Sequence, residues 1–322
     1  MADVFCIQPW LGKETKLTNG KKYKECCWLS KDYDIDQVRK DLTQGIKTSA
    51  CQRCWDAESN DLISRRQQQN LLADTLYNLS IENLQKLCIE QGYAPTIYQI
   101  NTGNKCNGAC IMCGPKASSK WQSLLKQHSP HTELPYDHEF DLDFDNAKFV
   151  DFGLDFDNAK FVEFLGGEPL LEKKVIPILE KLNKDCCISF VTNGSISIDK
   201  KLLDLLRKFN KLIICLSIDG IGPVFEYHRW PLKWNKLLEN LEQFRSLECD
   251  LSVSYTLTNI NLPYYDETIS WFKSQNLKYL INKVRHPEYF DPDNPISKKT
   301  ISALDKQDLL KGINRKDYGF NF

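Results

Sequence analysis

Three cysteines in one short segment are the residues of this chain best suited to chemistry. Cys106, Cys110 and Cys113 have a C-x3-C-x2-C spacing in the sequence CNGACIMC. Three thiolates on one loop can ligate three irons of a [4Fe–4S] cluster, which normally takes four cysteines. The fourth iron would then stay open to a ligand from outside the protein, much as a catalytic zinc keeps one position free. The spacing therefore favours a catalytic iron–sulfur site.

Zinc binding and a chance grouping of three buried cysteines are the alternatives for the same loop. A structural zinc site usually has four protein ligands, often C-x2-C pairs combined with histidine. The first histidine after the loop is His128, and none of the five histidines has the spacing of a metal ligand. The loop alone therefore favours iron and sulfur over zinc.

A second motif, Gly166-Gly167-Glu168-Pro169, closes a predicted strand. Two glycines allow a ligand to approach the backbone closely, and the edge of a parallel sheet offers backbone groups that can bind an ammonium group. Alone, the motif could be no more than a turn before a helix with proline at its start. Because the motif follows the three-cysteine loop by one crossover, it indicates a ligand site more specifically than it would alone.

The segment between residues 96 and 286 supplies the elements that must position both motifs. Short apolar runs alternate there with amphipathic segments of helical spacing. The predicted strands are 96–100, 160–165, 187–192, 211–218, 250–257 and 278–284, and the predicted helices are 118–127, 172–182, 199–209, 234–247 and 264–274. This alternation predicts parallel strands joined by right-handed crossovers, in a full or partial barrel or an open doubly wound sheet. In each of these folds the site lies at the carboxyl ends of the strands.

Taken together, the motifs resemble the radical S-adenosylmethionine (SAM) superfamily over about residues 96–286. Cys106, Cys110 and Cys113 match its cysteine loop, and Gly166–Glu168 match the motif that grips the amino group of SAM. The resemblance implies an α/β fold with a partial (β/α)6 TIM-like barrel, and an enzyme that uses a [4Fe–4S] cluster and SAM. In this family the reduced cluster cleaves SAM to methionine and a 5′-deoxyadenosyl radical, which abstracts hydrogen from a substrate.

The resemblance extends to further SAM contacts. In relatives that mature peptides or sulfatases, a serine after the fourth strand and an arginine twelve residues later contact SAM. Ser217 and Arg229 have this spacing, and Arg229 would pair with the SAM carboxylate. Met112 stands where the family most often has an aromatic residue, and it can cover the adenine by dispersion. The implied cofactor-binding residues are Met112, Gly166, Gly167, Glu168, Thr192, Asn193, Ser217, Asp219 and Arg229.

The N-terminal region carries a second group of cysteines. Cys6, Cys26, Cys51 and Cys54 are four widely spaced candidate ligands, and a tight turn at Gly20 between two short strands would bring Cys6 near Cys26. The sequence CQRCWDAESNDLISRR resembles the auxiliary-cluster modules called SPASM and twitch domains, in a subgroup that places the module first. That resemblance implies a second, auxiliary [4Fe–4S] cluster.

Two alternatives remain open for this N-terminal module. Five residues separate Gly20 from Cys26, where the pattern usually has four, so Cys27 could be the ligand in place of Cys26. Four cysteines can also hold zinc in a ribbon-like module. The other cysteines (Cys88, Cys186, Cys187, Cys215 and Cys249) lie in apolar helix or strand patterns and are expected to be buried and inert.

Differences in composition and hydrophobic pattern divide the chain into three regions. They are a cysteine-rich module (1–95), a core (96–290) and a polar tail (291–322) with one short helical stretch (301–310). Residues 64–92 have the spacing of a helical hairpin. The sequence LDFDNAKFVDFG at 142–153 is repeated with two changes at 154–165. We interpret the repeat as a local duplication in which only the second copy forms a strand.

Composition restricts the remaining possibilities. With 42% hydrophobic residues the chain can bury a substantial core. The balance of 42 basic and 43 acidic side chains argues against a dominant surface for nucleic acid, so no nucleic-acid partner is indicated, although it leaves room for a local basic patch. No apolar run reaches the length of a membrane span, and no signal peptide is visible, so we expect a cytoplasmic protein. Clustered cysteines in a reducing compartment indicate metal binding more often than disulfides.

The substrate is the least determined part of the function. Relatives with auxiliary modules often modify peptides or proteins, so the leading hypothesis is a peptide substrate. A small metabolite or nucleoside is the alternative within the same chemistry, and a non-catalytic zinc adaptor is the alternative from another class. An electron donor such as flavodoxin or ferredoxin is the expected partner of a radical SAM enzyme.

Overall fold

The computed structural model describes residues 4–16, 23–30, 32–60, 62–128, 156–284 and 287–293. The chain forms two compact units, and each is described separately below. Unit 1 consists of Met1–Asn101, Lys148–Glu163 and Lys181–Cys187, and unit 2 of Thr102–Ala147, Phe164–Glu180 and Ile188–Phe322.

The strands form one mostly parallel sheet in the order β2-β1-β3-β4-β5-β6-β7-β8, which is not closed into a barrel. The strands are β1 (Gly12–Lys16), β2 (Tyr23–Lys24), β3 (Ile97–Asn101), β4 (Phe161–Leu165), β5 (Cys187–Thr192), β6 (Lys211–Ser217), β7 (Asp250–Leu257) and β8 (Lys278–Lys283). The six strands predicted from residue 96 onward are therefore confirmed as β3–β8. The α/β class is confirmed, and the open sheet is consistent with a partial TIM-like barrel.

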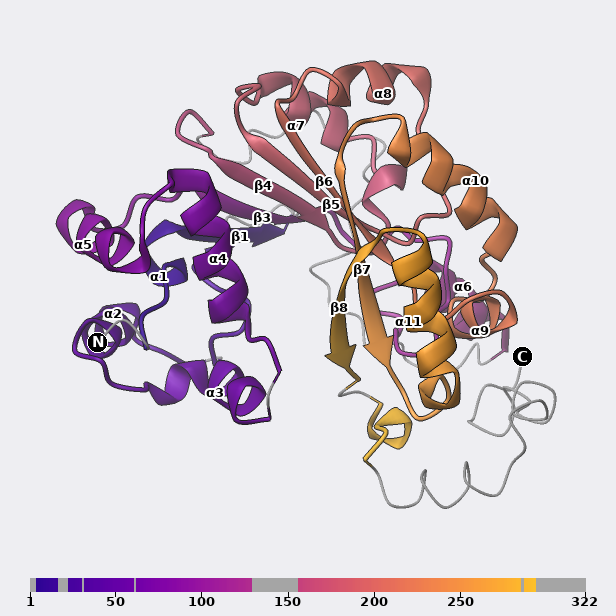
Figure 1. Ribbon diagram of the computed structural model, residues 1–322, viewed down its shortest axis with the longest axis horizontal. Helices are drawn as coiled ribbons and strands as arrows, with labels where there is room; N and C mark the ends of the chain where they lie inside the picture. The colour runs from indigo at the N-terminus through magenta and orange to yellow at the C-terminus, as the bar shows by residue number, and fades with distance from the viewer. Residues whose placement is uncertain are drawn as a thin grey trace. The chain divides into compact units, whose positions relative to one another are not determined.

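Unit 2 follows the predicted alternation of strands and helices. Its helices are α6 (Ser119–His128), α7 (Val175–Lys181), α8 (Lys200–Leu206), α9 (Pro223–His228), α10 (Trp234–Arg245) and α11 (Tyr265–Ser274), and Figure 1 shows them from magenta to orange. Asp199 caps α8 by accepting from the Leu202 N–H at 2.8 Å. Short 3-10 turns occupy Pro169–Leu171, Leu262–Tyr264 and Glu288–Phe290.

Strand β6 shows how the sheet separates a packed face from a polar one. Leu212, Ile214 and Leu216 are buried, whereas the alternate residues Cys215 and Ser217 are only half-buried. Because side chains alternate along a strand, the apolar residues share one face and Ser217 lies on the other. This alternation leaves the second face available for polar groups at the strand ends.

Unit 1 contains β1–β3 and a set of helices drawn in indigo and purple in Figure 1. The helices are α1 (Gln8–Leu11), α2 (Ile35–Thr43), α3 (Gln52–Ser59), α4 (Arg65–Tyr77) and α5 (Ile81–Gln91), with a 3-10 turn at Ser49–Cys51. The predicted hairpin over 64–92 is confirmed as α4 and α5. Ser64 and Gln67 form a capping box at its start, and Asn78 ends α4 with a positive φ of 53°.

Two features of the N-terminal strands bear on the predictions. Strands β1 and β2 pair antiparallel, with Glu14 opposite Lys24, as expected for two short strands flanking Gly20. Sequence reasoning did not predict that β1 also pairs parallel with β3, with Gly12 opposite Ile97. The first copy of the tandem repeat, Gly20 and the helical stretch at 301–310 lie outside the described residues.

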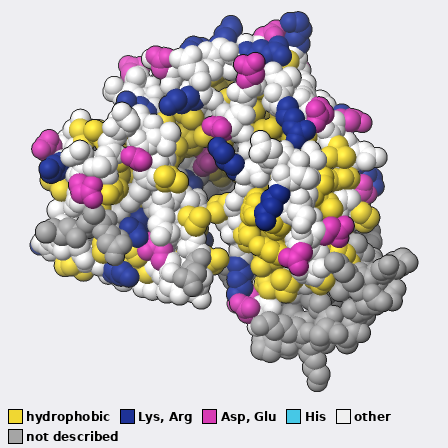
Figure 2. All heavy atoms as spheres, viewed as in Figure 1, with side chains coloured by type: hydrophobic (Ala, Val, Ile, Leu, Met, Phe, Trp, Pro, Cys, Tyr) yellow, Lys and Arg dark blue, Asp and Glu magenta, His cyan; other side chains and the backbone are white. Residues whose placement is uncertain are grey.

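Surface charge agrees with the balanced composition. Figure 2 shows basic and acidic side chains interspersed over the visible face, without a large area of one sign. Among the described residues, no helix has both the length and the apolar character that a membrane crossing needs.

Candidate functional site

The three-cysteine loop follows β3 and is fixed by backbone hydrogen bonds within unit 2. The Ala109 N–H donates to the Trp230 carbonyl at 2.6 Å, and the Ile111 N–H donates to the His228 carbonyl at 2.9 Å. The indole of Trp121, on α6, donates to the Cys110 carbonyl at 2.9 Å. These bonds hold the backbone of the loop in place around Cys110.

The three thiols differ in exposure and in proton affinity. Cys110 is buried, Cys106 is half-buried and Cys113 is exposed. A hydrogen bond to Cys113, together with burial, raises the pKa of the Cys110 thiol. The same bond lowers the pKa of Cys113, and nearby Arg229 lowers it further, although burial opposes both. Cys113 is therefore the first of this pair to become a thiolate.

The Gly166–Glu168 turn packs directly against the cysteine loop. The Gly167 N–H donates to the Gly103 carbonyl at 2.7 Å, and the Glu168 N–H donates to the Lys105 carbonyl at 2.8 Å. A Cβ atom on Gly167 would lie 2.5 Å from that Lys105 oxygen, closer than real Cβ contacts allow. Glycine is thus required because the backbones of the two motifs touch.

Glu168 is fully buried, and its carboxylate is bound by protein donors. It accepts from the Thr192 hydroxyl at 2.8 Å, from the Asn193 N–H at 2.7 Å and from the Leu170 N–H at 3.1 Å. Burial raises the pKa of Glu168, and these hydrogen bonds oppose that rise. The side chain of Glu168 therefore joins its own turn to the end of β5.

Asn193 links the end of β5 to the cysteine loop through a residue that sequence reasoning missed. Its amide donates to Asn107 Oδ1 at 2.9 Å, and Asn107 donates to Ser195 Oγ at 2.8 Å. Ser195 in turn donates to Asn193 Oδ1 at 2.7 Å. Asn107 lies between Cys106 and Cys110, and a polar residue in a loop carries no periodic signal that could have revealed its role.

Arg229 and Asp219 form a buried ion pair near the thiols. Arg229 Nη2 and Asp219 Oδ2 lie 2.6 Å apart, and Asp219 is fully buried. The Thr256 N–H donates to Asp219 Oδ1 at 2.8 Å, which fixes the carboxylate. Arg229 Nε is buried and has no hydrogen-bond partner among the described residues. The guanidinium thus keeps one donor that a ligand could use.

Met112, Ser217 and His228 also belong to unit 2. Met112 packs against an apolar cluster that includes Ile111, Ile260 and Phe290. Ser217 is half-buried at the end of β6. His228 is a buried core residue whose ring nitrogens contact the Val224 carbonyl and the Thr258 hydroxyl.

The N-terminal cysteines meet at a pocket within unit 1. Its lining is Cys6, Gln8, Pro9, Cys26, Trp28, Leu29, Cys51, Cys54 and Arg66. Cys27 does not line it, and its thiol hydrogen-bonds with the neighbouring Cys26 thiol and with Glu14. Burial raises the pKa of Cys6 and Cys54, and raises that of Cys51 to about 12. The fold therefore brings the four predicted ligands to one pocket, and Cys27 lies beside Cys26 but outside the lining.

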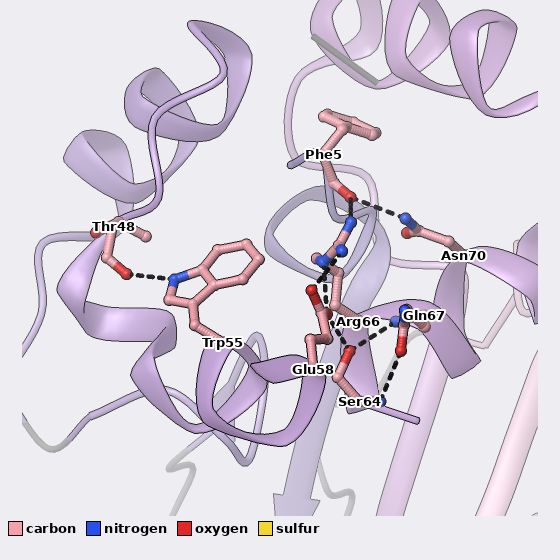
Figure 3. A network of polar contacts seen from close by, with 8 residues as sticks. All are labelled: Phe5, Thr48, Trp55, Glu58, Ser64, Arg66, Gln67 and Asn70. Carbon is pink, nitrogen blue, oxygen red and sulfur yellow. Dashed lines mark hydrogen bonds and ion pairs between the residues drawn. The ribbon is translucent and has the colours of Figure 1, made fainter. Parts of the chain in front are cut away.

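A buried ion-pair network holds this pocket together, as Figure 3 shows. Arg66 contacts both carboxylate oxygens of Glu58, at 3.0 and 2.7 Å, and donates to the Phe5 carbonyl at 3.2 Å. Asn70 donates to the same carbonyl at 2.8 Å. Burial opposes ionisation of Glu58, yet hydrogen bonds from Arg66 and Ser64 lower its pKa. The network ties the chain before Cys6 to helices α3 and α4.

No three His, Cys, Asp or Glu side chains in the described part of the chain converge closely enough to hold a single metal ion. A zinc ion needs its ligands around one point. The thiolates of a cubane cluster each bind a different iron, so they lie further apart.

Comparison with known families places the chain. Residues 100–272, more than half of the 322 residues, match the Radical SAM superfamily. The chain belongs to this superfamily, whose members are enzymes, and the matched segment contains the cysteine loop, the Gly-Gly-Glu turn and Arg229. No curated protein matches the sequence.

Three solved structures illustrate distant similarity to the chain. anSMEcpe with bound AdoMet has 18% identity and a TM-score of 0.43, and the match covers 66% of this chain and 61% of that one. Streptococcus suis SuiB bound to precursor peptide SuiA has 13% identity and a TM-score of 0.42, with 69% and 50% covered. TYW1 with a lysine-pyruvate adduct has 14% identity and a TM-score of 0.34, with 67% and 73% covered. The chain spans about three fifths of the length of the first.

Proposed function

We propose that this protein binds a [4Fe–4S] cluster through Cys106, Cys110 and Cys113, cleaves SAM reductively at it, and abstracts hydrogen from a peptide or protein substrate. The observation that carries the proposal is the contact between the two motifs. Gly167 and Glu168 donate to the carbonyls of Gly103 and Lys105, so the predicted SAM-binding turn adjoins the predicted cluster loop. When bound, the cluster supplies the electron that splits the sulfonium of SAM.

The protein's own residues then position SAM and protect the reaction. Arg229 offers its buried Nε to the SAM carboxylate, while Asp219 holds the guanidinium in place. Glu168, bound by Thr192 and Asn193, keeps the turn in the shape that receives the SAM amino group. Ser217, at the end of β6, offers a hydroxyl on the face opposite the apolar one. Glu168, Asp219 and Arg229 are buried, so little water reaches these contacts.

We further propose that Cys6, Cys26, Cys51 and Cys54 hold an auxiliary [4Fe–4S] cluster. All four line one pocket, which favours Cys26 over Cys27 as the ligand. Four thiolates would leave no iron open, so this centre would relay electrons or bind substrate through its surroundings. The peptide substrate rests on the resemblance of this module to SPASM and twitch domains, and a cytoplasmic location remains an expectation from the sequence.

Anaerobic reconstitution tests the metal content of both sites. We expect about eight irons with matching acid-labile sulfide per chain, and about four in a C106A/C110A/C113A variant. Cys26→Ser should also lose about four irons, whereas Cys27→Ser should lose none. Zinc without sulfide would instead support a non-catalytic adaptor.

A functional assay tests the reaction itself. Reconstituted protein with SAM and excess dithionite should form 5′-deoxyadenosine. Lack of that product in a protein that retains both clusters would refute the proposed function.

A further inference from the structure

The solvent side of the cysteine loop is basic. From residue 91 to residue 132 the sequence contains no Asp or Glu, yet it contains Lys105, Lys116 and Lys120. Lys105 and Lys116 are exposed and Lys120 is half-exposed. We call these three lysines the basic loop surface. None of them has an ion-pair partner among the described residues, so their charges are not neutralised locally.

Hydrogen bonds place this surface beside the thiols. The Ser119 N–H donates to the Asn104 carbonyl at 2.7 Å, and the Cys106 N–H donates to Ser119 Oγ at 3.0 Å. The start of α6, which carries Lys120, is therefore joined to the backbone on both sides of Lys105. Lys116 follows Cys113, the exposed thiol, by three positions.

One aromatic side chain completes the surface. Lys120 Nζ lies 5.8 Å from the centre of the Trp230 ring, and Trp230 is 37% exposed. The Trp230 carbonyl accepts from Ala109 in the cysteine loop, so this side chain belongs to the same local structure. Exposed tryptophan is a common feature of protein interfaces, which are enriched in aromatic residues.

The charge balance on this side is positive. The nearest acidic groups of the site, Glu168 and Asp219, are fully buried and engaged by protein donors. Glu226 is paired with Lys233 at 3.0 Å. The amino end of α6 adds a further partial positive charge from its helix dipole. A partner that docks here must therefore carry negative charge.

We infer that the basic loop surface is the docking site of an acidic one-electron donor, such as a small flavoprotein. This inference rests on the proposed function, because only a reducible centre at Cys106, Cys110 and Cys113 needs a donor at this place. Lys105 directly precedes Cys106 and Lys116 follows Cys113 by three positions, so both lysines adjoin the ligands of that centre in the chain. The donor loses one electron, the centre gains one, and no covalent bond forms or breaks between the two proteins. Opposite charges accelerate such encounters and make them depend on salt.

Reduced flavodoxin in its hydroquinone form is the probe, and it is oxidised to the semiquinone as it donates. The test variant is K116E/K120E. The matched control is K208E/K211E, which reverses two exposed lysines just before and at the start of β6. The start of a strand lies at the opposite edge of a parallel sheet from the strand end that precedes the cysteine loop. The initial rate of 5′-deoxyadenosine formation is measured at low ionic strength and in about 0.5 M NaCl, which shortens the screening length to a few Å.

At low ionic strength we expect K116E/K120E to be about tenfold slower than wild type or the control. The difference should shrink at high salt, and all three proteins should react equally with excess dithionite, which also shows that they fold. Equal flavodoxin rates in the two variants, with normal dithionite rates, would overturn the docking site alone. Failure of dithionite to yield product in wild type would refute the proposed function and the docking site together.

Discussion

The two groups of cysteines differ in how the fold assembles them. Cys106, Cys110 and Cys113 lie on one loop, and Cys113 is exposed. The N-terminal pocket gathers its thiols from separate segments of unit 1, and Cys6, Cys26 and Cys54 are buried. One group is local in sequence and includes an exposed thiol, while the other is non-local and mostly buried.

Two arginines, one beside each group of thiols, differ in how fully the protein occupies their donors. Arg229 keeps a buried Nε without a protein partner, although its Nη2 pairs with Asp219. Arg66 in the N-terminal pocket has both edges of its guanidinium occupied, by Glu58 and by the Phe5 carbonyl. An unused donor suits a site that binds and releases a ligand, whereas a satisfied network suits a site that is built once. The comparison therefore predicts an exchanging site in unit 2 and a structural or relay site in unit 1.

The largest effect should come from removing one thiol of each group. Cys110→Ala should abolish 5′-deoxyadenosine formation, because the open iron depends on all three ligands of the loop. Cys51→Ala should retain some cleavage of SAM without turnover of substrate, because the two sites are separate. The measurement is product formed with SAM and dithionite after reconstitution. Equal and total loss in both variants, with the core still folded, would break the comparison.

Replacing Arg66 tests whether the enclosed pocket is built before it binds anything. Arg66→Met leaves the carboxylate of Glu58 buried without its partner, which should lower the free energy of unfolding by about 3–5 kcal/mol. The side chains are 8% and 16% exposed, so solvent screens the pair only weakly. Urea unfolding of the full chain before reconstitution measures the change.

Two further variants control for other causes of that loss. Arg53 is an exposed arginine over the Trp28 ring, 5.1 Å from its centre, so Arg53→Met should cost less than about 1 kcal/mol. The double variant R66M/E58L removes both charges and should recover much of the stability. A cost for Arg66→Met no larger than that for Arg53→Met would show that the network does not hold the pocket.

Gly167→Ala tests the close contact between the cysteine loop and the Gly-Gly-Glu turn. The added Cβ would lie 2.5 Å from the Lys105 oxygen, so the two backbones must separate. We expect a loss of about 1–3 kcal/mol in stability and a fall of about tenfold or more in 5′-deoxyadenosine formation. Gly114→Ala is the control, since its Cβ would have no atom within 4 Å. Similar activities in the two variants would mean that the contact does not position SAM.

Sequence patterns were sufficient for the elements whose signals are local. Strands β3–β8 carry apolar runs, and the α4–α5 hairpin has a capping box at Ser64 and Gln67. The pairing of β1 with β3 was missed because the residues of β1, GKETK, are mostly polar and have no strand pattern. A polar strand can be fixed by its neighbours, and single-sequence reasoning cannot see them.

The same distinction between local and distant signals applies to the candidate site. The cysteine loop and the Gly-Gly-Glu turn could be recognised because the residues of each motif lie close together in the sequence. Asn107, which joins the loop to Asn193, was missed because its partner lies far away in the chain. The sequence could not show whether Cys26 or Cys27 is the ligand either. The two residues are adjacent, so their distances along the chain to every other ligand differ by only one position. Only the turn around them decides which one faces the pocket.

The smallest expected effect is a loss of stability at acid pH that comes from the Glu58–Arg66 ion pair. Arg66 and Ser64 hold the pKa of Glu58 below its usual value in the folded protein, although burial opposes them. A carboxyl whose folded pKa is depressed contributes stability above its unfolded pKa of about 4.3, and that contribution disappears as pH falls through the folded pKa. The stability difference between wild type and Glu58→Gln should therefore be constant near neutral pH and shrink below about pH 4. Urea midpoints measured across this range report it, and a difference that grows toward acid pH would mean that Glu58 is not the ionised partner of Arg66.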